Sequence, residues 1–376
     1  MYSTISFWEQ RWLDKADIVV VGSGLVGMQV AIQLKQKFSH RAVWVLDKQQ
    51  FGTSASLRNA GFACFGSAGE ILDDAQNMGM DNAIHLYEQR FQGLNNLLKT
   101  YGTTSIGFDP TGGYEIFQTD QSDSFEAISL RLDEINSRLF DVHGGQSFQI
   151  RNSKSLNMNV FGQTIFAQNE GALQTHLLVE RVKNHALSLG VSFFENMDVL
   201  KFEELDSGKW QIHLKDNNAI IEAKELIICT NGYTKELLPE IQVAPARGQV
   251  LVTKPIPNLP FRGIFHADKG YVYFRSLGSR ILIGGARNLQ FAEEETTESN
   301  SNPIIKAELI RWLTEIIAPN QSIEIEYEWA GIMGMDKNRQ PIVEKYGEHC
   351  YLAVRMGGMG VALSSLVAEK LAILVD

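Results

Sequence analysis

Hydrophobic and polar positions at the start of the chain follow the order of a βαβ unit. Residues 17–21 (DIVVV) form a short apolar run that ends in glycines, which predicts a buried parallel strand. Residues 25–37 repeat apolar positions with helical spacing, and residues 42–47 (AVWVLD) predict a second strand. Strand, glycine turn, helix and strand in this order predict a βαβ unit near the N-terminus.

Helical and strand-like stretches are mixed further along the chain. Amphipathic periodicity predicts helices at 81–100, 121–139, 172–189 and 303–317. Alternation and short apolar runs predict strands at 191–203, 210–214 and 226–230, and several antiparallel strands over 243–285. The tract 292–302 is acidic and polar, so we expect a surface loop there. The chain closes with a strand, a glycine-rich turn and a helix, so dinucleotide-type elements occur at its start, middle and end.

Composition and charge narrow the class of partner. A length of 376 residues suits about two domains. The net charge of −10 argues against nucleic acid as the main partner, because phosphate binding needs a clustered basic surface. No stretch approaches the roughly 18 apolar residues of a membrane span, and the N-terminus lacks the pattern of a secretory signal. We therefore expect a protein that binds small molecules and has no integral membrane segment.

The cysteines and histidines indicate the compartment and exclude a metal-site motif. The three cysteines are an odd number, lie far apart and form no C-x-x-C pair. This usage fits a reducing, cytoplasmic environment and argues against a disulfide framework or a structural zinc site. The eight histidines show no H-x-x-x-H spacing either, so we predict no metal.

A complete G-x-G-x-x-G motif follows the first predicted strand. Its residues are Gly22, Ser23, Gly24, Leu25, Val26 and Gly27. The three glycines permit the tight turn, the approach of the backbone to a pyrophosphate, and close packing of helix on strand. Asp47 ends the second strand twenty residues after Gly27, where a carboxylate can accept hydrogen bonds from ribose hydroxyls. No arginine directly follows Asp47, which disfavours a 2′-phosphate and leaves NAD or FAD.

Small residues and further motifs favour FAD. Residues 51–70 combine glycines and small hydroxyl residues with Arg58 and Asn59, which suits a backbone that runs along a long flavin. The further motifs are SASLRNAG (54–61), Val199, Thr230-Asn231-Gly232, the hairpin 271–287, WAGIMGMDKNRQPIVE (329–344) and the glycine turn 357–362. Together they resemble the D-amino-acid-oxidase-like family of FAD enzymes, which includes glycine, sarcosine and glutamylputrescine oxidases. The resemblance covers nearly the whole chain from Ala16, with Glu344 replacing the last glycine of one motif.

The resemblance implies an α/β fold in two parts. A discontinuous FAD-binding dinucleotide (βαβ) domain is expected at 1–80, 160–240 and 335–376. An inserted α+β substrate domain built on an antiparallel sheet is expected at 81–159 and 241–334. FAD would be held by Gly22, Ser23, Gly24, Leu25, Val26, Gly27, Asp47, Lys48, Ser54, Ala55, Arg58, Asn59, Ala60, Gly61, Val199, Thr230, Asn231, Gly232, Gly357, Gly358, Met359, Gly360 and Val361. The helix after the last glycines would stabilise negative charge on the reduced flavin.

Several departures from the family pattern leave the substrate open. Glycine oxidase carries carboxylate-clamping arginines where this chain has Ile332-Met333 and Gly358. The lysine that is implicated in oxygen reaction in sarcosine oxidase corresponds to Leu282. The cysteine that tethers flavin in sarcosine oxidase would fall near Met333 or Gly334, so we expect non-covalent FAD. Cys64, near the flavin stretch, is expected to be a small core residue.

The hairpin supplies the candidate catalytic residues. In an alternating strand Tyr271, Tyr273 and Arg275 share one face, so Arg275 could hold a carboxylate and a tyrosine could close the site. The alternative is that all three are residues of the sheet surface. Arg247 and Arg355 are weaker candidates for binding the carboxylate.

The favoured reaction is oxidation of the C–N bond of a small amine or amino acid. Hydride would pass to flavin N5, giving an imine, with O2, a quinone or another electron carrier as acceptor. No dedicated protein base is required. A second hypothesis is oxidation of a hydroxy acid or similar alcohol, which needs a base such as His266 or His85. A third is a flavin-bound subunit without turnover of its own.

Overall fold

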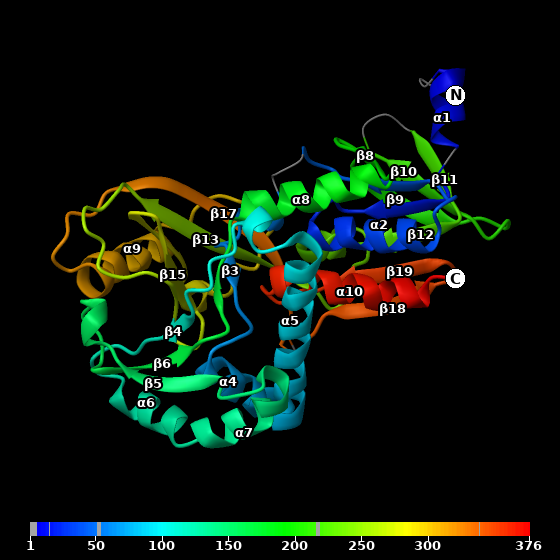
Figure 1. Ribbon diagram of the computed structural model, residues 1–376. Coiled ribbons are helices and arrows are strands. Elements are labelled where there is room, and N and C mark those ends of the chain that lie inside the picture. The colour runs from blue at the N-terminus through cyan, green and yellow to red at the C-terminus, as the bar shows by residue number, and fades with distance from the viewer. Residues whose placement is uncertain (1–5, 15, 51–53, 216–218, 338) are drawn as a thin grey trace.

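The structure, a computed structural model, shows two lobes joined side by side (Figure 1). It describes residues 6–14, 16–50, 54–215, 219–337 and 339–376. One lobe carries both described ends of the chain and a mainly parallel sheet. The other is built on a larger, mainly antiparallel sheet. The fold is therefore mixed α/β, with a Rossmann-type dinucleotide-binding part and a substrate part, as predicted.

The first lobe is organised around a six-stranded sheet. Its strands are, in spatial order, β18 (Ile342–Gly347), β19 (Cys350–Val354), β12 (Glu225–Ile228), β1 (Ile18–Val21), β2 (Val43–Leu46) and β8 (Ser192–Phe194). All neighbours pair in parallel except β18, which is antiparallel to β19. The strands come from the start, middle and end of the chain, which explains why the dinucleotide elements are scattered in the sequence.

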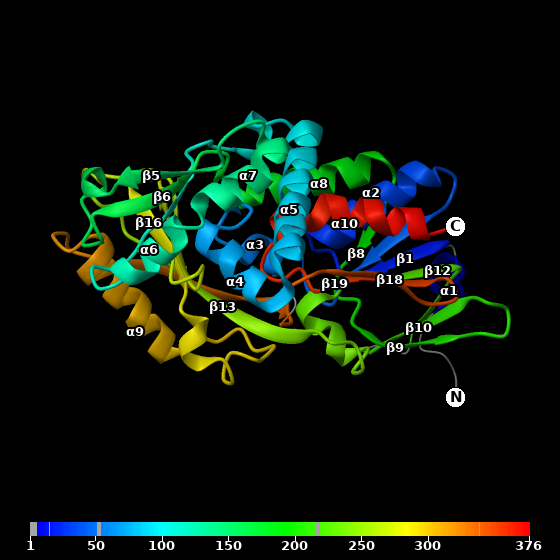
Figure 2. The ribbon, with the colours of Figure 1, turned by 90° about the horizontal axis from the view of Figure 1, so that it is seen from below.

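Helices cover one face of this sheet and a small sheet covers the other (Figure 2). The helices are α2 (Leu25–Lys37), α8 (Thr175–Ser188) and α10 (Gly360–Leu374), and the small sheet is β11 (Ile220–Ala223), β10 (Trp210–Leu214) and β9 (Val199–Glu204). Every residue of β1, β2, β12 and β19 is buried, because both faces are covered. Their near-continuous apolar runs are the sequence signature of this arrangement.

The second lobe is organised around an eight-stranded sheet. Its strands are, in spatial order, β17 (Ile325–Met335), β13 (Ala244–Thr253), β16 (Arg280–Gly285), β15 (Val272–Leu277), β14 (Ile264–Ala267), β4 (Gly113–Glu115), β6 (Gln163–Ala167) and β5 (Phe148–Asn152). All pairs are antiparallel except β14 with β4. Helix α9 (Pro303–Arg311) continues as a π-helical turn (Trp312–Ile317) and packs its apolar face on this sheet.

A further group of helices packs beside the two large sheets. It comprises α3 (Ala55–Arg58), α4 (Ala68–Met78), α5 (Met80–Tyr101), α6 (Ser122–Ser129) and α7 (Leu132–His143). The long helix α5 lies against α10, and the contact is close because Gly93 has no side chain. A Cβ at Gly93 would stand 2.1 Å from the carbonyl oxygen of Ala362. A short sheet of β3 (Phe62–Ala63) and β7 (Gly171–Ala172) also lies between the lobes.

The predicted elements differ from the structure in several places. The helix predicted at 121–139 is two helices, α6 and α7, and the strand predicted at 191–203 is two strands, β8 and β9. Strand β6 pairs inside the eight-stranded sheet, although we expected 160–240 to belong to the dinucleotide domain. The domain limits stay a proposal, and this pairing favours an internal limit after residue 167. The tract 292–302 is largely exposed, as predicted, but Glu294 is fully buried because it forms a bidentate ion pair with Arg247.

The N-terminal helix α1 (Phe7–Leu13) projects from the end of the first lobe (Figure 1). Trp12 packs its ring against Trp44 and Phe194, which fixes the helix to the lobe. Within the described part of the chain, no helix is both long and apolar enough to cross a membrane.

Candidate active site

The glycine turn after β1 forms one end of the site. A Cβ at Gly22 would stand 2.7 Å from the carbonyl oxygen of Cys229, and one at Gly27 would stand 1.9 Å from the carbonyl oxygen of Gly22. Only glycine at these positions lets α2 begin directly on the sheet. Gly24 is the N-cap of α2, so the positive end of this helix opens at the turn, as a pyrophosphate requires.

Asp47 supports this turn from the end of β2. One carboxylate oxygen, Oδ2, accepts hydrogen bonds of 2.7 Å from both the main-chain N–H and the hydroxyl of Ser23. The other, Oδ1, accepts from the main-chain N–H of Gln49 at 3.0 Å. A carboxylate offers about four acceptor sites, so one is left for a hydroxyl of a bound nucleotide.

A cavity of about 990 Å3 extends from this turn into the second lobe. The predicted cofactor residues come together along it, although they lie in segments more than 300 residues apart. Those that line the cavity are Gly22, Gly24, Leu25, Val26, Asp47, Lys48, Ser54, Ala55, Arg58, Asn59, Ala60, Val199, Thr230, Asn231, Gly232, Gly357, Gly358, Met359, Gly360 and Val361. Ser23, Gly27 and Gly61 lie beside it and shape its wall instead.

The second glycine turn precedes α10 in the same wall. Gly357 and Gly358 have φ angles of +58° and +81°, a backbone region that favours glycine. The side-chain oxygen of Asn231 accepts hydrogen bonds from the main-chain N–H groups of Arg355 and Met356 and so ties the middle segment to this turn. A long, glycine-lined cavity of this size fits a flavin dinucleotide.

The predicted catalytic residues separate in the structure. Tyr271 and Tyr273 line the cavity, and burial raises the pKa of Tyr273 to about 12. Arg275 is outside the lining. Its guanidinium is buried and donates to the main-chain carbonyls of Gly61 at 2.6 Å and Leu173 at 2.8 Å. Tyr273 and Arg275 share a face of β15 as expected, but the loop at Gly61 covers the arginine.

Arg287, at the end of the same hairpin, lies in the cavity with the two tyrosines. Among the described residues it has no carboxylate partner, and its guanidinium carbon lies 4.8 Å from the ring centroid of Phe291. Burial lowers the pKa of Arg287 from its ordinary value, yet the group stays charged near neutral pH. The weaker candidates are occupied, because Arg247 pairs with Glu294 and Arg355 with Asp336.

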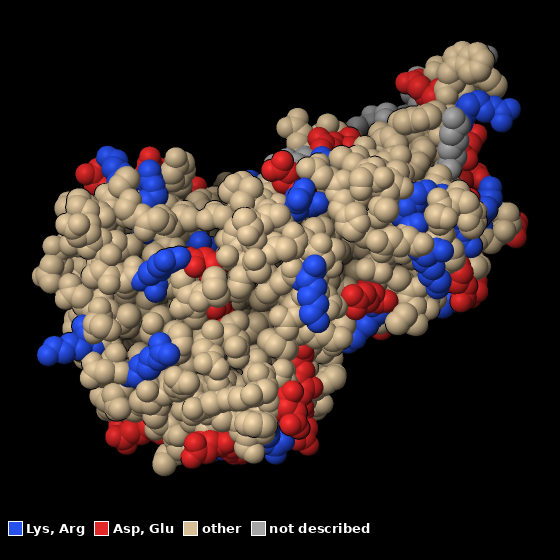
Figure 3. Space-filling view, in the orientation of Figure 1, with Lys and Arg blue, Asp and Glu red and all other residues tan. Residues whose placement is uncertain are grey.

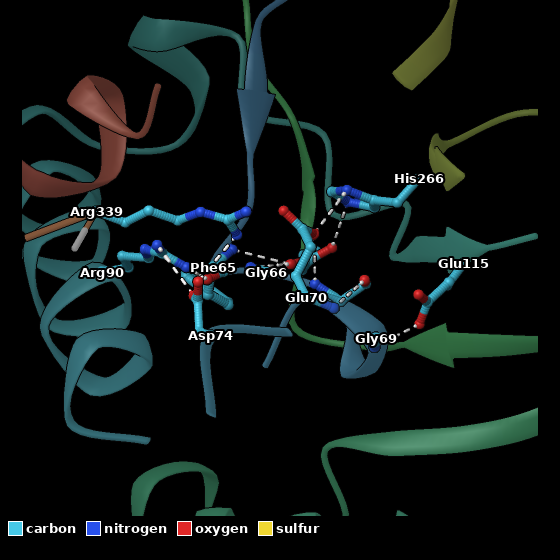
Figure 4. Close-up of polar contacts among 11 residues, drawn as sticks. Phe65, Gly66, Gly69, Glu70, Asp74, Arg90, Glu115, His266 and Arg339 are labelled. Atoms are coloured by element: carbon cyan, nitrogen blue, oxygen red, sulfur yellow. Dashed lines mark hydrogen bonds and ion pairs between the residues drawn. The ribbon is translucent and has the colours of Figure 1, made fainter. Parts of the chain in front are cut away.

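His266 lies in the cavity wall between two buried carboxylates (Figure 4). Its Nδ1 is 3.4 Å from Oε2 of Glu70, and its Nε2 is 3.2 Å from Oε2 of Glu170. Burial opposes the charge of His266, but the two carboxylates raise its pKa well above the ordinary value. This arrangement favours the protonated form of His266, with Nε2 in a hydrogen bond to Glu170 and Nδ1 in an ion-pair contact with Glu70.

Two arginines, Arg90 buried and Arg339 partly buried, complete this wall (Figure 4). Arg90 donates to the carbonyl of Phe65 at 3.0 Å and pairs with Asp74 at 3.6 Å. Arg339 pairs with both Asp74 at 2.9 Å and Asp73 at 3.0 Å. Burial alone would lower the pKa of Arg339, but these carboxylates raise it. Both arginines thus have carboxylate partners, whereas Arg287 has none among the described residues.

Sequence reasoning did not predict this wall. Glu70 and Arg339 lie in the segments 51–70 and 329–344 that favoured FAD, but neither was named as a site residue, and Glu170 lies in no motif. Arg287 is the last residue of the hairpin segment 271–287, so its position just after a predicted strand could have marked it as a candidate site residue. Cys64 lines the cavity, and burial raises the pKa of its thiol well above the ordinary value, as expected of an unreactive core residue.

The fold and the cavity define a class: two-part oxidoreductases that bind a flavin dinucleotide through a Rossmann-type turn. Comparison with known proteins places the chain within that class. A family model described as FAD dependent oxidoreductase, the DAO family, matches residues 17–374. The chain belongs to this family, and its cofactor is FAD. This confirms the resemblance to D-amino-acid-oxidase-like enzymes.

Relatives and solved structures agree with this family. Two proteins described as probable oxidoreductase OrdL are similar over most of the chain. The one from Haemophilus influenzae is 21% identical, covering 96% of this chain and 83% of the relative; the one from Rhizobium meliloti is 26% identical, covering 93% and 81%. The fold is similar to L-proline dehydrogenase from P. horikoshii (TM-score 0.75, 18% identity, 96% of this chain and 93% of that one) and to glycine oxidase from Bacillus cereus (TM-score 0.75, 17% identity, 96% and 94%).

Proposed function

We propose that this FAD-dependent oxidoreductase oxidises the C–N bond of a small amine that carries a carboxylate, such as an amino acid. The observation that supports this most is Arg287, which lies in the cavity with no carboxylate partner among the described residues, whereas Arg90 and Arg339 in the same wall are paired with carboxylates. An unpaired charge that is partly buried is costly, and a substrate carboxylate would compensate it through charge-assisted hydrogen bonds. Relatives of this fold include enzymes named for glycine and proline.

We assign the predicted residues to parts of non-covalently bound FAD. The turn from Gly22 to Gly27 and the start of α2 would hold the pyrophosphate, and Asp47 a ribose hydroxyl. The turn at Gly357 and Gly358 would face the flavin ring. Bound FAD supplies the hydride acceptor of the reaction.

The chain's own residues then position the substrate. Arg287 would fix the carboxylate, and Tyr271 and Tyr273 would close the cavity around the carbon that loses hydride. The amine enters deprotonated and leaves as an imine, which water hydrolyses. The acceptor that reoxidises the enzyme is O2, a quinone or another carrier.

The state of His266 argues against oxidation of a hydroxy acid. Such a reaction needs a free base that can take the hydroxyl proton. Both ring nitrogens of His266 lie within ion-pair distance of carboxylates, and these carboxylates raise its pKa, so its surroundings disfavour a role as proton acceptor. The other candidate, His85, lies on the exposed side of α5, where it contacts Gln89 and Glu88.

Anaerobic reduction of the flavin tests the proposal. The purified, FAD-loaded protein would be mixed with compounds that share one carbon chain: an amino acid, its decarboxylated amine and its 2-hydroxy acid. We expect the amino acid to bleach the flavin absorbance fastest and the hydroxy acid not at all. Bleaching by hydroxy acids alone, across several chain lengths, would overturn the proposed function.

A further inference from the structure

A second cavity of about 530 Å3 adjoins the first in the substrate lobe. It lies between α4, α6 and the ends of β4 and β14, and it shares Asp73 and Lys269 with the wall of the first cavity. The sequence motifs and the family resemblance did not predict this second cavity. Its walls combine apolar side chains with charged ones. The apolar side chains include Leu72, Met80, Ile116, Phe117 and Ile128, and the charged ones, besides Glu115, are Asp73, Asp268, Arg131 and Lys269.

Glu115 is one of the residues that line this second cavity, and Figure 4 shows its carboxylate beside Gly69. The residue is 4% exposed, and its Oε2 accepts a hydrogen bond of 3.0 Å from the main-chain N–H of Gly69. Among the described residues, no basic side chain lies within ion-pair distance of its carboxylate. Glu70 and Glu170, by contrast, are both paired with His266. Glu115, like Arg287, thus has no oppositely charged partner among the described residues.

The helical surface beside the second cavity is acidic overall, and its one charged residue that lines the cavity is Arg131. The segment 120–141, which contains α6 and most of α7, holds six acidic and two basic side chains. All of them are exposed: Asp120, Asp123, Glu126, Asp133, Glu134 and Asp141 against Arg131 and Arg138. Figure 3 shows these carboxylates gathered along the lower edge of the lobe. Such a surface attracts cations and repels anions.

We propose that the second cavity is a subsite for an ammonium group on an apolar chain, and that this group is the distal end of the substrate. The apolar side chains suit methylene groups, and Glu115 would pair with the terminal ammonium. The inference rests on the proposed function, in which Arg287 holds the carboxylate end. The substrate is then an elongated amine with a carboxylate at one end and a cation at the other.

The wall that the two cavities share is where the apolar chain of the substrate would pass from the first cavity into the second. Lys269 on the β14–β15 turn pairs with Asp73 on α4 at 3.3 Å, and the lysine side chain is mostly exposed. An ion pair of this exposure contributes little free energy, so a substrate can displace it. Asp73 keeps its second partner, Arg339, when Lys269 moves away.

A matched pair of substrates tests this subsite. Lysine and 2-aminoheptanoate have the same chain length and differ in a terminal ammonium against a terminal methyl group. Burial raises the pKa of Glu115 to about 7, so kcat/KM is measured at a pH of about 8.5, where lysine is still charged. We expect the wild-type enzyme to favour lysine by about tenfold or more.

The variant Glu115→Gln should abolish this preference by slowing lysine and sparing 2-aminoheptanoate. Glu180→Gln, an exposed change on α8, is the control and should keep the preference. Inhibition of the wild-type enzyme gives the same comparison without a variant: hexan-1-amine, which carries a terminal ammonium, should inhibit more strongly than hexan-1-ol. Equal kcat/KM for the two amino acids in the wild type, or an unchanged ratio in Glu115→Gln, overturns the subsite. Failure of every amino acid to reduce the flavin would instead overturn the proposed function.

Discussion

Replacing Arg287 by glutamine is the most informative perturbation of the proposed substrate site. The change removes a charge that has no carboxylate partner among the described residues and keeps a side chain with hydrogen-bond donors. The other arginines of the wall, Arg90 and Arg339, are held by Asp74 and cannot take over its role without leaving their own partners. A substrate carboxylate would therefore lose its charged partner.

The expected loss follows from the burial of Arg287. Charge-assisted hydrogen bonds contribute about 1.5–3 kcal/mol, and the lower part of this range applies because the side chain is only partly buried. A loss of about 1.5–2 kcal/mol corresponds to a reduction of kcat/KM by roughly 10- to 30-fold. The decarboxylated amine makes no such contact, so its kcat/KM should stay unchanged.

The assay compares both compounds in three proteins with equal FAD content. The control is Arg151→Gln, an exposed arginine whose guanidinium stacks on Phe166, outside the cavity lining. We expect Arg287→Gln to lower kcat/KM for the amino acid alone and Arg151→Gln to change neither value. An equal loss for the amino acid and for its decarboxylated amine would refute the assignment of Arg287 to the carboxylate.

Three further predictions follow from the same structure. Gly27→Ala should lower the FAD content and cost about 2 kcal/mol or more of stability, because the new Cβ would meet the carbonyl of Gly22. The control is Gly162→Ala, whose Cβ would stand in open space, and equal urea midpoints for the two variants would contradict this prediction. Nitrogen NMR should find both ring nitrogens of His266 protonated at a pH of about 8, since its carboxylate partners raise its pKa; a neutral ring would reopen the role of a base. Burial raises the pKa of Glu115 from 4.5 to about 7, so the protonated form favours folding, and this contribution to stability is lost as pH rises from about 4.5 to 7. The stability of Glu115→Gln relative to the wild type should therefore rise by about 3 kcal/mol between these two pH values. Parallel pH profiles of stability for the two proteins would contradict this.

The parts of the fold that depend on local pattern could be predicted from the sequence. The run at 17–21 and the periodicity at 25–37 correspond to β1 and α2 within a residue, because buried parallel strands and helices leave a regular apolar signature. The glycine motif carried its own physical reason, which the close approach of Gly27 to Gly22 shows directly.

The parts that depend on contacts between distant segments could not be predicted. Alternation placed Tyr273 and Arg275 on one face correctly, but it could not show that the loop at Gly61 covers Arg275. Glu294 lies in an acidic tract that is polar throughout, and its burial follows from an arginine 47 residues away. The pairing of His266 with Glu70 and Glu170 likewise joins three segments.

Single-turnover oxidation of an α-deuterated substrate tests the central claim most directly. The FAD-loaded protein is mixed without oxygen with the amino acid that reduces it fastest, in protiated and deuterated form, and the products are counted. We predict slower flavin bleaching with deuterium, and one carbonyl product and one ammonia or amine released for each FAD reduced. Bleaching without release of a nitrogen product, or with no effect of α-deuteration, would contradict oxidation of the C–N bond by hydride transfer.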